Sequence, residues 1–162
     1  MRLASTPWLP ALLLLGVGCA HSGAATPEDE EAAVAEGVRA AIRLYSPGRE
    51  PARGPYCVEV NSSPGFERAV TEILSAQMGL DAVPMTECAT AGKNAVLWVK
   101  VQGYEWMDWM TRAQLDVRGT VEPRPDQNGG YRLGWYRASF RASLGYRDGH
   151  WTTIAASDLG RI

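Results

Sequence analysis

Hydrophobic residues recur with a helical period in two stretches of the chain and with a strand-like period in several others. Over residues 27–45 and 64–79 the apolar positions lie three or four residues apart, which predicts two amphipathic helices, the second capped by Ser63 ahead of Pro64. The two apolar stripes consist of Val34, Gly37, Val38, Ala41, Ile42 and Tyr45, and of Phe66, Ala69, Val70, Ile73, Leu74 and Met78.

Apolar and polar residues alternate in most of the remaining chain, and this period of two is typical of strands with one buried face. Asp148-Gly149 predicts a tight hairpin turn between the last two strands, and residues 80–85 form a short extended stretch. The strands predicted from the alternation cover residues 56–60, 97–101, 113–121, 136–146 and 151–156. Two helices that cover one face of a mostly antiparallel sheet of about five strands predict an α+β fold, a two-layer sandwich.

Length and composition limit the number of domains and the kinds of function to be expected. A chain of 162 residues with 46% hydrophobic and 21% charged residues suits one globular domain. Residues 20–108 carry seven Arg or Lys against thirteen Asp or Glu, and residues 109–162 carry eight against five. Neither part has the basic excess of a nucleic-acid-binding protein, so we expect no nucleic-acid partner.

The N-terminal segment has the layout of a cleaved signal. Arg2 precedes an apolar stretch at residues 8–17, and small residues lead from there to Cys19. Roughly ten apolar residues are about half of what a helix needs to cross a bilayer, so a permanent membrane span is disfavoured.

The residues before Cys19 resemble the bacterial lipobox, in which a Leu, a small or β-branched residue and a Gly or Ala precede the cysteine. Val17, Gly18 and Cys19 match this motif, while Gly16 stands where Leu is usual. The resemblance implies diacylglycerol on Cys19, cleavage before it and acylation of the new amino group. Stable attachment follows, because each buried methylene contributes about 0.8 kcal/mol and a protein needs two or more chains to stay on the membrane.

This lipoprotein resemblance also implies a domain organisation. Residues 1–18 would be the signal peptide, 19–27 the lipidated cysteine with a short tether, and 28–162 a single domain facing the periplasm. Ala20 after the cysteine resembles signals for the outer membrane rather than the inner membrane. Ordinary secretion with cleavage nearby, or an uncleaved N-terminal anchor, are the alternatives.

The assignment of Cys19 to lipid leaves Cys57 and Cys88 as a pair in an oxidising compartment. A disulfide between them would clamp a strand-helix-strand unit and stabilise the fold by about 3.5 kcal/mol in the loop-entropy model. The alternative is two free thiols.

Catalytic chemistry finds little support in the sequence. His21 and His150 are the only histidines, so no His/Cys metal cluster is expected, and no Gly-rich phosphate loop is present. Ser62 and Ser63 fit helix capping better than nucleophilic catalysis, and the acids Glu105 and Asp108 resemble ordinary surface carboxylates. We expect a protein without catalytic activity, cofactor or metal.

One candidate binding feature is aromatic. Strand alternation places Trp98, Tyr104 and Trp106 opposite the apolar face, where such rings would stack on sugars, pack on a protein or lie beneath a helix. Further aromatic residues are Trp109, Tyr131, Trp135 and Trp151.

The second candidate is a stripe of arginines that point away from the apolar faces, with only Asp116 to offset them. A hairpin register centred near Asp126 would bring Arg112 beside Arg141 and Asp116 opposite Arg137. Clustered arginines would attract a phosphate or carboxylate, whereas the alternative is an ordinary solvated sheet face. The stripe consists of Arg112, Arg118, Arg137, Arg141 and Arg147.

These features favour a non-catalytic, membrane-anchored envelope lipoprotein that binds an envelope protein or glycan through the aromatic edge or the arginine stripe. The alternative is a glycan- or small-ligand-binding module in which Trp98, Trp106 and Trp135 line a cleft. The order of elements is loosely similar to that of small outer-membrane assembly and secretion-accessory lipoproteins, a likeness at the level of the fold alone.

Overall fold

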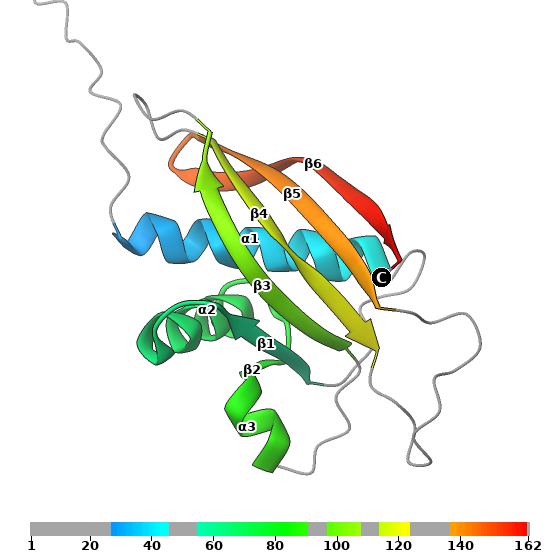
Figure 1. Cartoon of the computed structure of the whole chain (residues 1–162). Coiled ribbons are helices and arrows are strands. Elements are labelled where there is room, and N and C mark those ends of the chain that lie inside the picture. Colours follow the sequence, from blue (N-terminus) through cyan, green and yellow to red (C-terminus); the bar gives the residue numbers. More distant parts are fainter. Residues whose placement is uncertain (1–26, 46–54, 91–96, 108–113, 124–136, 162) are drawn as a thin grey trace, which may run out of the picture.

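The computed structural model describes residues 27–45, 55–90, 97–107, 114–123 and 137–161. No helix within these ranges is long and apolar enough to cross a membrane. The elements follow one another as α1 (Pro27–Tyr45), β1 (Tyr56–Val60), α2 (Pro64–Ala76), β2 (Ala82–Pro84), α3 (Met85–Thr90), β3 (Leu97–Trp106), β4 (Gln114–Pro123), β5 (Ala138–Arg147) and β6 (His150–Arg161) (Figure 1).

These six strands form one sheet in the order β2-β1-β3-β4-β5-β6. β1 runs parallel to β2 and to β3, and β3 to β6 form an antiparallel meander. The predicted α+β fold with a mostly antiparallel sheet is confirmed. The sheet has one strand more than expected because the extended stretch pairs with β1 as β2, and the six-residue helix α3 is not signalled by any periodicity.

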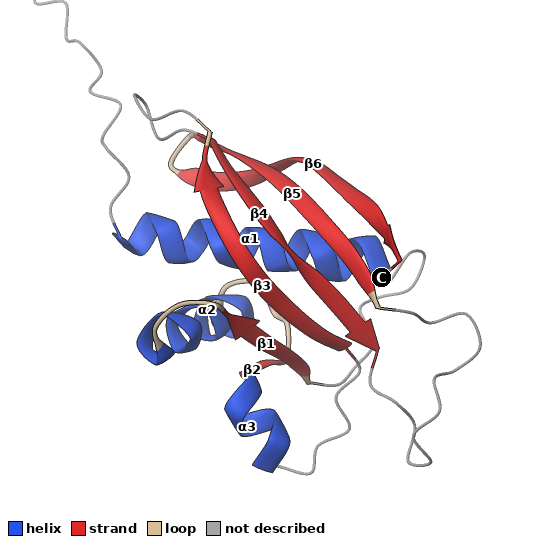
Figure 2. Cartoon of the chain, in the orientation of Figure 1, coloured by secondary structure: helices blue, strands red, loops and turns tan. Residues whose placement is uncertain are grey.

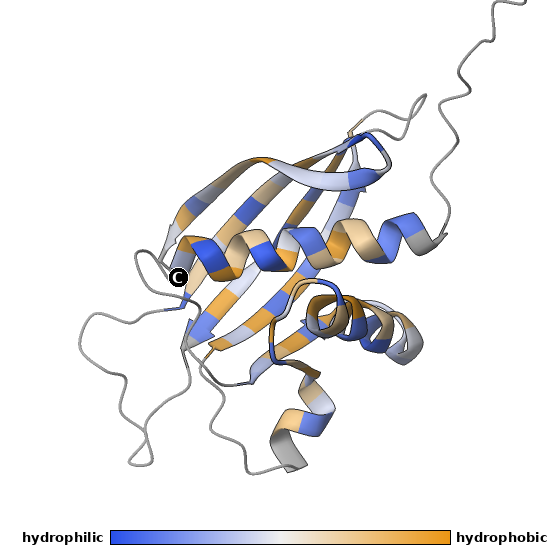
Figure 3. Cartoon of the chain, turned by 180° about the vertical axis from the view of Figure 1, so that it is seen from behind, coloured by the Kyte–Doolittle hydropathy of each residue, from blue (hydrophilic) through white to orange (hydrophobic). Residues whose placement is uncertain are grey.

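Helices α1 and α2 cover the same face of the sheet (Figures 2 and 3). α1 packs on β3, β4, β5 and β6, while α2 packs on β1 and β2 and against α1. The hydroxyl of Ser63 accepts a hydrogen bond from the backbone N–H of Phe66 at 3.2 Å and caps α2 as predicted. The core between the layers contains Val34, Val38 and Ile42 of α1, Val70 and Leu74 of α2, and Tyr56, Leu97, Leu115, Phe140 and Leu144 of the sheet.

α1 approaches the sheet closely at Gly37. A Cβ atom at this position would lie 2.7 Å from the side chain of Val117 on β4. Ala33 and Ala41, one turn before and one turn after, are fully buried as well. This row of small residues lets the helix lie directly on the middle of the sheet without a gap.

A β-bulge interrupts the pairing of β3 with β4. Val101 pairs with Gly119 and Gly103 pairs with Arg118, so Gln102 is the extra residue on β3. Gly119 permits this close pairing, since a Cβ atom there would overlap the carbonyl oxygen of Lys100.

The bulge reverses the direction of the aromatic side chains that follow it. Tyr104 and Trp106 pack against the main core, and the ring of Tyr104 stacks on Phe66 of α2 with centroids 5.8 Å apart. The prediction that both rings lie opposite the apolar face is wrong, because one inserted residue shifts a pattern of period two to the other face. Trp98 precedes the bulge and lies on the predicted side.

The turn between β5 and β6 has the predicted form. Asp148 and Gly149 have φ angles of 53° and 83°, the left-handed pair of a two-residue hairpin turn. β6 extends to Arg161 along the edge of the sheet, beyond the range that alternation indicated.

Cys57 and Cys88 form the predicted disulfide, with their Cα atoms 5.9 Å apart. The bond joins β1 to α3 on the side of the sheet that faces away from α1 and α2. There the two cysteines pack with Val83, Met85 and Trp98 as a small apolar cluster separate from the main core. The disulfide therefore holds the short helix α3 against one edge of this otherwise polar face.

Replacement of Gly37 by Ala tests the close contact of α1 with β4. We expect Gly37→Ala to lower the free energy of unfolding by about 1–3 kcal/mol, because the new methyl group must displace Val117. Gly65→Ala in the first turn of α2 is the matched control, since its nearest atom would be Ser63 Oγ at 4.0 Å. The control should be neutral or stabilising by up to about 1 kcal/mol. Equal effects of both substitutions in urea denaturation would contradict the packing argument.

Joint replacement of Cys57 and Cys88 by Ala should lower the free energy of unfolding by about 3–4 kcal/mol, because the unfolded chain gains freedom when the closed loop opens. Urea denaturation of the oxidised protein, the reduced protein and the double variant measures this difference. The free energy of unfolding of the reduced wild type should approach that of the double variant. A wild type that is indifferent to reductant, or peptide mapping that finds two free thiols, would rule out the bond.

Candidate binding surface on the outer face of the sheet

The sheet face opposite α1 and α2, called the outer face below, carries polar and charged side chains at alternate positions of β4 and β5, with Gly145 as the exception. Among the described helices, only α3 reaches this side, through Cys88. The residues of the outer face include Lys100 on β3, Asp116, Arg118, Thr120 and Glu122 on β4, and Ser139, Arg141 and Ser143 on β5, with Arg137 just before β5.

Asp116 is the centre of a charged network on this face, and its side chain is only 1% exposed. One carboxylate oxygen accepts a hydrogen bond from the hydroxyl of Ser143 at 2.6 Å, and the other accepts one from Nε of Arg141 at 2.6 Å. A second nitrogen of Arg141 also pairs with the carboxylate, and the guanidinium of Arg118 lies 3.7 Å from it. One buried carboxylate therefore positions two arginines.

The network changes the acidity of Asp116. Burial raises its pKa, but the hydrogen bonds from Ser143 and Arg141, together with the charges of Arg141 and Arg118, outweigh burial and lower the pKa below its ordinary value. A carboxylate whose pKa is lower in the folded state stabilises the fold above its unfolded-state pKa. This contribution is lost as the pH falls through the folded-state pKa.

Further ion pairs connect the remaining charges of the outer face. Lys100 pairs with Glu59 of β1 at 2.8 Å, and Arg137 pairs with Glu122 of β4 at 2.8 Å. Arg118 also approaches Glu105 at 3.8 Å. The expectation that only Asp116 offsets the arginines is wrong, because Glu105 and Glu122 also pair with them. The outer face is a network of ion pairs rather than a stripe of positive charge.

The register of the β4-β5 hairpin differs from the one expected. Arg118 lies opposite Arg141, and Asp116 lies opposite Ser143, so the hairpin is not centred near Asp126. Asp116 therefore does not face Arg137. The two like charges of Arg118 and Arg141 are tolerated side by side because the Asp116 carboxylate forms an ion pair with each of them.

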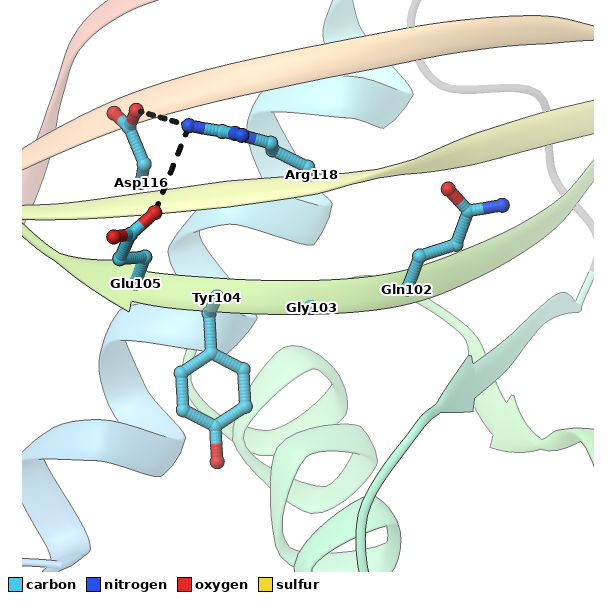
Figure 4. A pocket seen from close by; sticks show the side chains of 6 residues that line it. All are labelled: Gln102, Gly103, Tyr104, Glu105, Asp116 and Arg118. Carbon is cyan, nitrogen blue, oxygen red and sulfur yellow. Dashed lines mark ion pairs between the residues drawn. The ribbon is translucent and has the colours of Figure 1, made fainter.

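An open pocket of about 310 Å³ lies beside the β3 bulge. Gly103, opposite Arg118, has no side chain and leaves space there. Figure 4 shows Glu105, Asp116 and Arg118 turned toward one another on one side of the sheet, and the ring of Tyr104 on the other side. The pocket is lined by Gln102, Gly103, Tyr104, Glu105, Asp116 and Arg118.

The structure places four of the five arginines of the predicted stripe. Arg118, Arg137 and Arg141 lie together on the outer face, and Arg147 is exposed at the end of β5, next to the hairpin turn. Arg112 lies outside the described residues.

The three tryptophans of the predicted aromatic cleft are not brought together. Trp98 lies on the outer face beside the disulfide, and Trp106 lies on the helix side of the sheet. Trp135 lies outside the described residues. Trp98 and Trp106 therefore do not line one cleft.

Sequence reasoning missed most carboxylates and the lysine of this surface. Lys100 and Glu122 occupy polar positions in alternating strands, so alternation could have assigned them to the outer face. Glu59 could have been found only from the parallel pairing of β1 with β3, which places Glu59 opposite Lys100. Glu105 reaches this face only because of the bulge.

The chemistry of these groups suits recognition through hydrogen bonds and charge. The hydroxyl of Ser143 donates a hydrogen bond to the carboxylate of Asp116. His150 lies in the β5-β6 hairpin, with its Nδ1 3.1 Å from the carbonyl oxygen of Asp148.

Within the described ranges, no three side chains of His, Cys, Asp or Glu gather in an arrangement that would hold a metal ion.

Comparisons with protein-family models, with curated proteins and with solved structures found no match to the chain.

Replacement of Asp116 by Asn tests the central network. We expect Asp116→Asn to lower the free energy of unfolding at pH 7 by about 2–4 kcal/mol, because Arg141 and Arg118 lose their shared anion. Below the folded-state pKa of Asp116 the wild type has lost the same charge, so the difference between the two proteins should shrink as the pH falls. Urea denaturation at a series of pH values measures this convergence.

Glu105→Gln is the matched control, since its side chain is 72% exposed and its ion pair with Arg118 is long. We expect a change within about 0.5 kcal/mol. A stability difference for Asp116→Asn that stays constant from neutral to acid pH would show that the charge of Asp116 is not what stabilises the fold.

Proposed function

We propose that this protein is a non-catalytic lipoprotein of the bacterial envelope, anchored to the outer membrane through Cys19, and that its outer face binds another envelope component. The lipobox-like residues ending at Cys19 support the anchor. The observation that carries the binding role is the set of arginines that Asp116 and Glu122 hold in place on a sheet face that α1 and α2 leave uncovered.

These arginines are fixed and still accessible. The side chains of Arg118, Arg137 and Arg141 keep 50%, 46% and 38% of their surface exposed while each is paired with a carboxylate. A side chain that is already immobilised loses less conformational entropy when a partner binds. The guanidinium groups therefore present ordered hydrogen-bond donors to an incoming surface.

The balance of charge indicates the kind of partner. Carboxylates and cations are neighbours across the outer face, so a purely anionic polymer would be repelled at some positions as it is attracted at others. A protein surface with both kinds of charge, or a polar glycan, complements this network of ion pairs better than an anionic polymer does. We propose an envelope protein as the partner.

A second candidate is the binding of a glycan or another small polar ligand. The pocket beside the β3 bulge favours it, because Gln102, Glu105 and Arg118 offer donors and acceptors around a space of about 310 Å³. The site would then be this polar pocket, since Trp98 and Trp106 lie on opposite sides of the sheet.

Removal of the Cys19 thiol tests the proposed lipid anchor. We expect Cys19→Ala to abolish incorporation of radiolabelled palmitate and to release the protein from the membrane fraction, because no other residue of the lipobox-like motif can carry the thioether. Cys57→Ala with Cys88→Ala serves as the control and should keep the label. A wild type that takes up no label, or a Cys19→Ala variant that keeps it, would contradict the anchor.

A photo-crosslinking amino acid at Gln102 tests the outer face in intact cells. We expect a discrete protein adduct that Arg137→Glu reduces at least about tenfold, because the reversed charge faces Glu122 and the partner. Arg68→Glu on α2 is the matched control, with the same substitution at a side chain that is 69% exposed on another surface. An adduct that both substitutions reduce equally would contradict the site. No protein adduct, combined with a tryptophan fluorescence shift on addition of glycan fragments, would favour the second candidate.

A further inference from the structure

Aromatic and apolar side chains gather at the end of the sheet where β3 ends and β5 turns into β6. The ring of Trp151 lies 5.6 Å from Trp106 and 5.2 Å from Tyr146, measured between centroids. Met107 follows Trp106 directly. We call these four residues the aromatic end.

The aromatic end exposes apolar surface. Met107 is 51% exposed and Tyr146 is 37% exposed, while Trp151, whose ring packs on that of Tyr146, is buried. Two of the large apolar side chains that the described part of the chain exposes, Met107 and Tyr146, therefore lie at this one end of the sheet. An exposed apolar group of this kind marks a contact surface more often than an isolated side chain does.

α1 starts beside this end and runs away from it. Glu30, the fourth residue of α1, lies near Tyr104, whose pKa is raised by burial and by the charge of Glu30, and Tyr104 is two residues before Trp106. Its last residue, Tyr45, donates a hydrogen bond at 3.1 Å to the carbonyl oxygen of Ser139, at the opposite end of β5. α1 therefore begins at the aromatic end (Figure 1).

We propose that the aromatic end rests on the lipid surface that carries the Cys19 anchor, an inference that depends on the lipid attachment proposed above. The residues between Cys19 and α1 span at most about 25 Å when fully extended, so the start of α1 stays close to the bilayer. Tyr and Trp rings favour the headgroup region of a membrane, and Met107 supplies an apolar side chain at the same level.

The charges around the aromatic end indicate the type of lipid. Asp29, Glu30 and Glu31 lie in the first turns of α1, while Arg147 and Asp148 offset each other in sign beside the hairpin turn. Three carboxylates near the surface disfavour a strongly anionic membrane. The expected lipid is zwitterionic.

A pair of tryptophan reporters tests this contact in the full lipidated chain, purified from membranes and reconstituted into phosphatidylcholine vesicles. One variant is Met107→Trp at the aromatic end, and the matched control is Leu159→Trp, at an apolar residue of β6 that is 58% exposed. The vesicles contain lipid brominated near the start of the acyl chains, which quenches only tryptophans that touch the bilayer. The tryptophan emission of the wild-type protein, which has six tryptophans of its own, is subtracted from the emission of each variant.

We expect a loss of the emission added by Met107→Trp in brominated vesicles and no loss of the emission added by Leu159→Trp. A further Tyr146→Glu substitution should restore the lost emission, while the protein still floats with the vesicles. Equal quenching of both reporters, or quenching of neither by brominated lipid, would overturn the contact.

Different results would contradict the proposed lipid anchor and the proposed contact of the aromatic end with lipid. A protein that floats with vesicles but shows no quenching at position 107 keeps its anchor and loses the proposed contact. If acrylamide in the water also fails to quench that reporter, a second copy of the chain covers the aromatic end. A protein that does not float at all overturns the anchor and, with it, this inference.

Discussion

The close packing of α1 against the middle of the sheet determines the arrangement of the other parts of the molecule. Because Gly37 has no side chain, the helix lies directly on Val117, and its neighbours reach strands on both sides of β4. Buried Glu36 extends this contact to the sheet edge, where it accepts a hydrogen bond from the hydroxyl of Thr153 at 2.7 Å and pairs with Arg39. Most large apolar side chains of the meander face this helix, and mainly polar ones occupy the other side.

The bulge in β3 adjusts this division of the two faces. Before the bulge, Trp98 belongs to the outer face and packs on the disulfide. After the bulge, Tyr104 and Trp106 belong to the core, and Glu105 points to the charged network. A single inserted residue, Gln102, thus moves two large rings out of the candidate binding surface and opens a pocket beside Arg118.

Asp116 connects the fold to the proposed binding role. Its burial would cost free energy if its oxygens had no partners, but Ser143 and Arg141 satisfy both of them. The bond to Arg141 fixes the orientation of its guanidinium group, while the side chain of Arg141 remains 38% exposed. The stability of the fold and the proposed recognition would therefore depend on the same carboxylate.

The two proposed surfaces lie on different parts of the domain. The aromatic end is where α1 begins, and the outer face extends along the strands away from it. A domain that touches lipid at the aromatic end would hold the outer face at an angle to the membrane, open to a partner. In this arrangement the proposed tether after Cys19 would contribute orientation as well as attachment.

Local sequence pattern determined the two long helices, the strands β1 and β3 to β6 and the α+β class, whereas the pairing of Cys57 with Cys88 was inferred from the cysteine count once Cys19 was assigned to lipid. Helical and strand periods follow from backbone geometry and from the burial of one face, and both are properties of consecutive residues. The bulge at Gln102, the register that places Arg118 opposite Arg141, and the ion pairs of Lys100 and Arg137 were decided by the tertiary structure alone. These features depend on which residues of neighbouring strands meet, and that is set by packing between segments far apart in the chain rather than by any period within one segment.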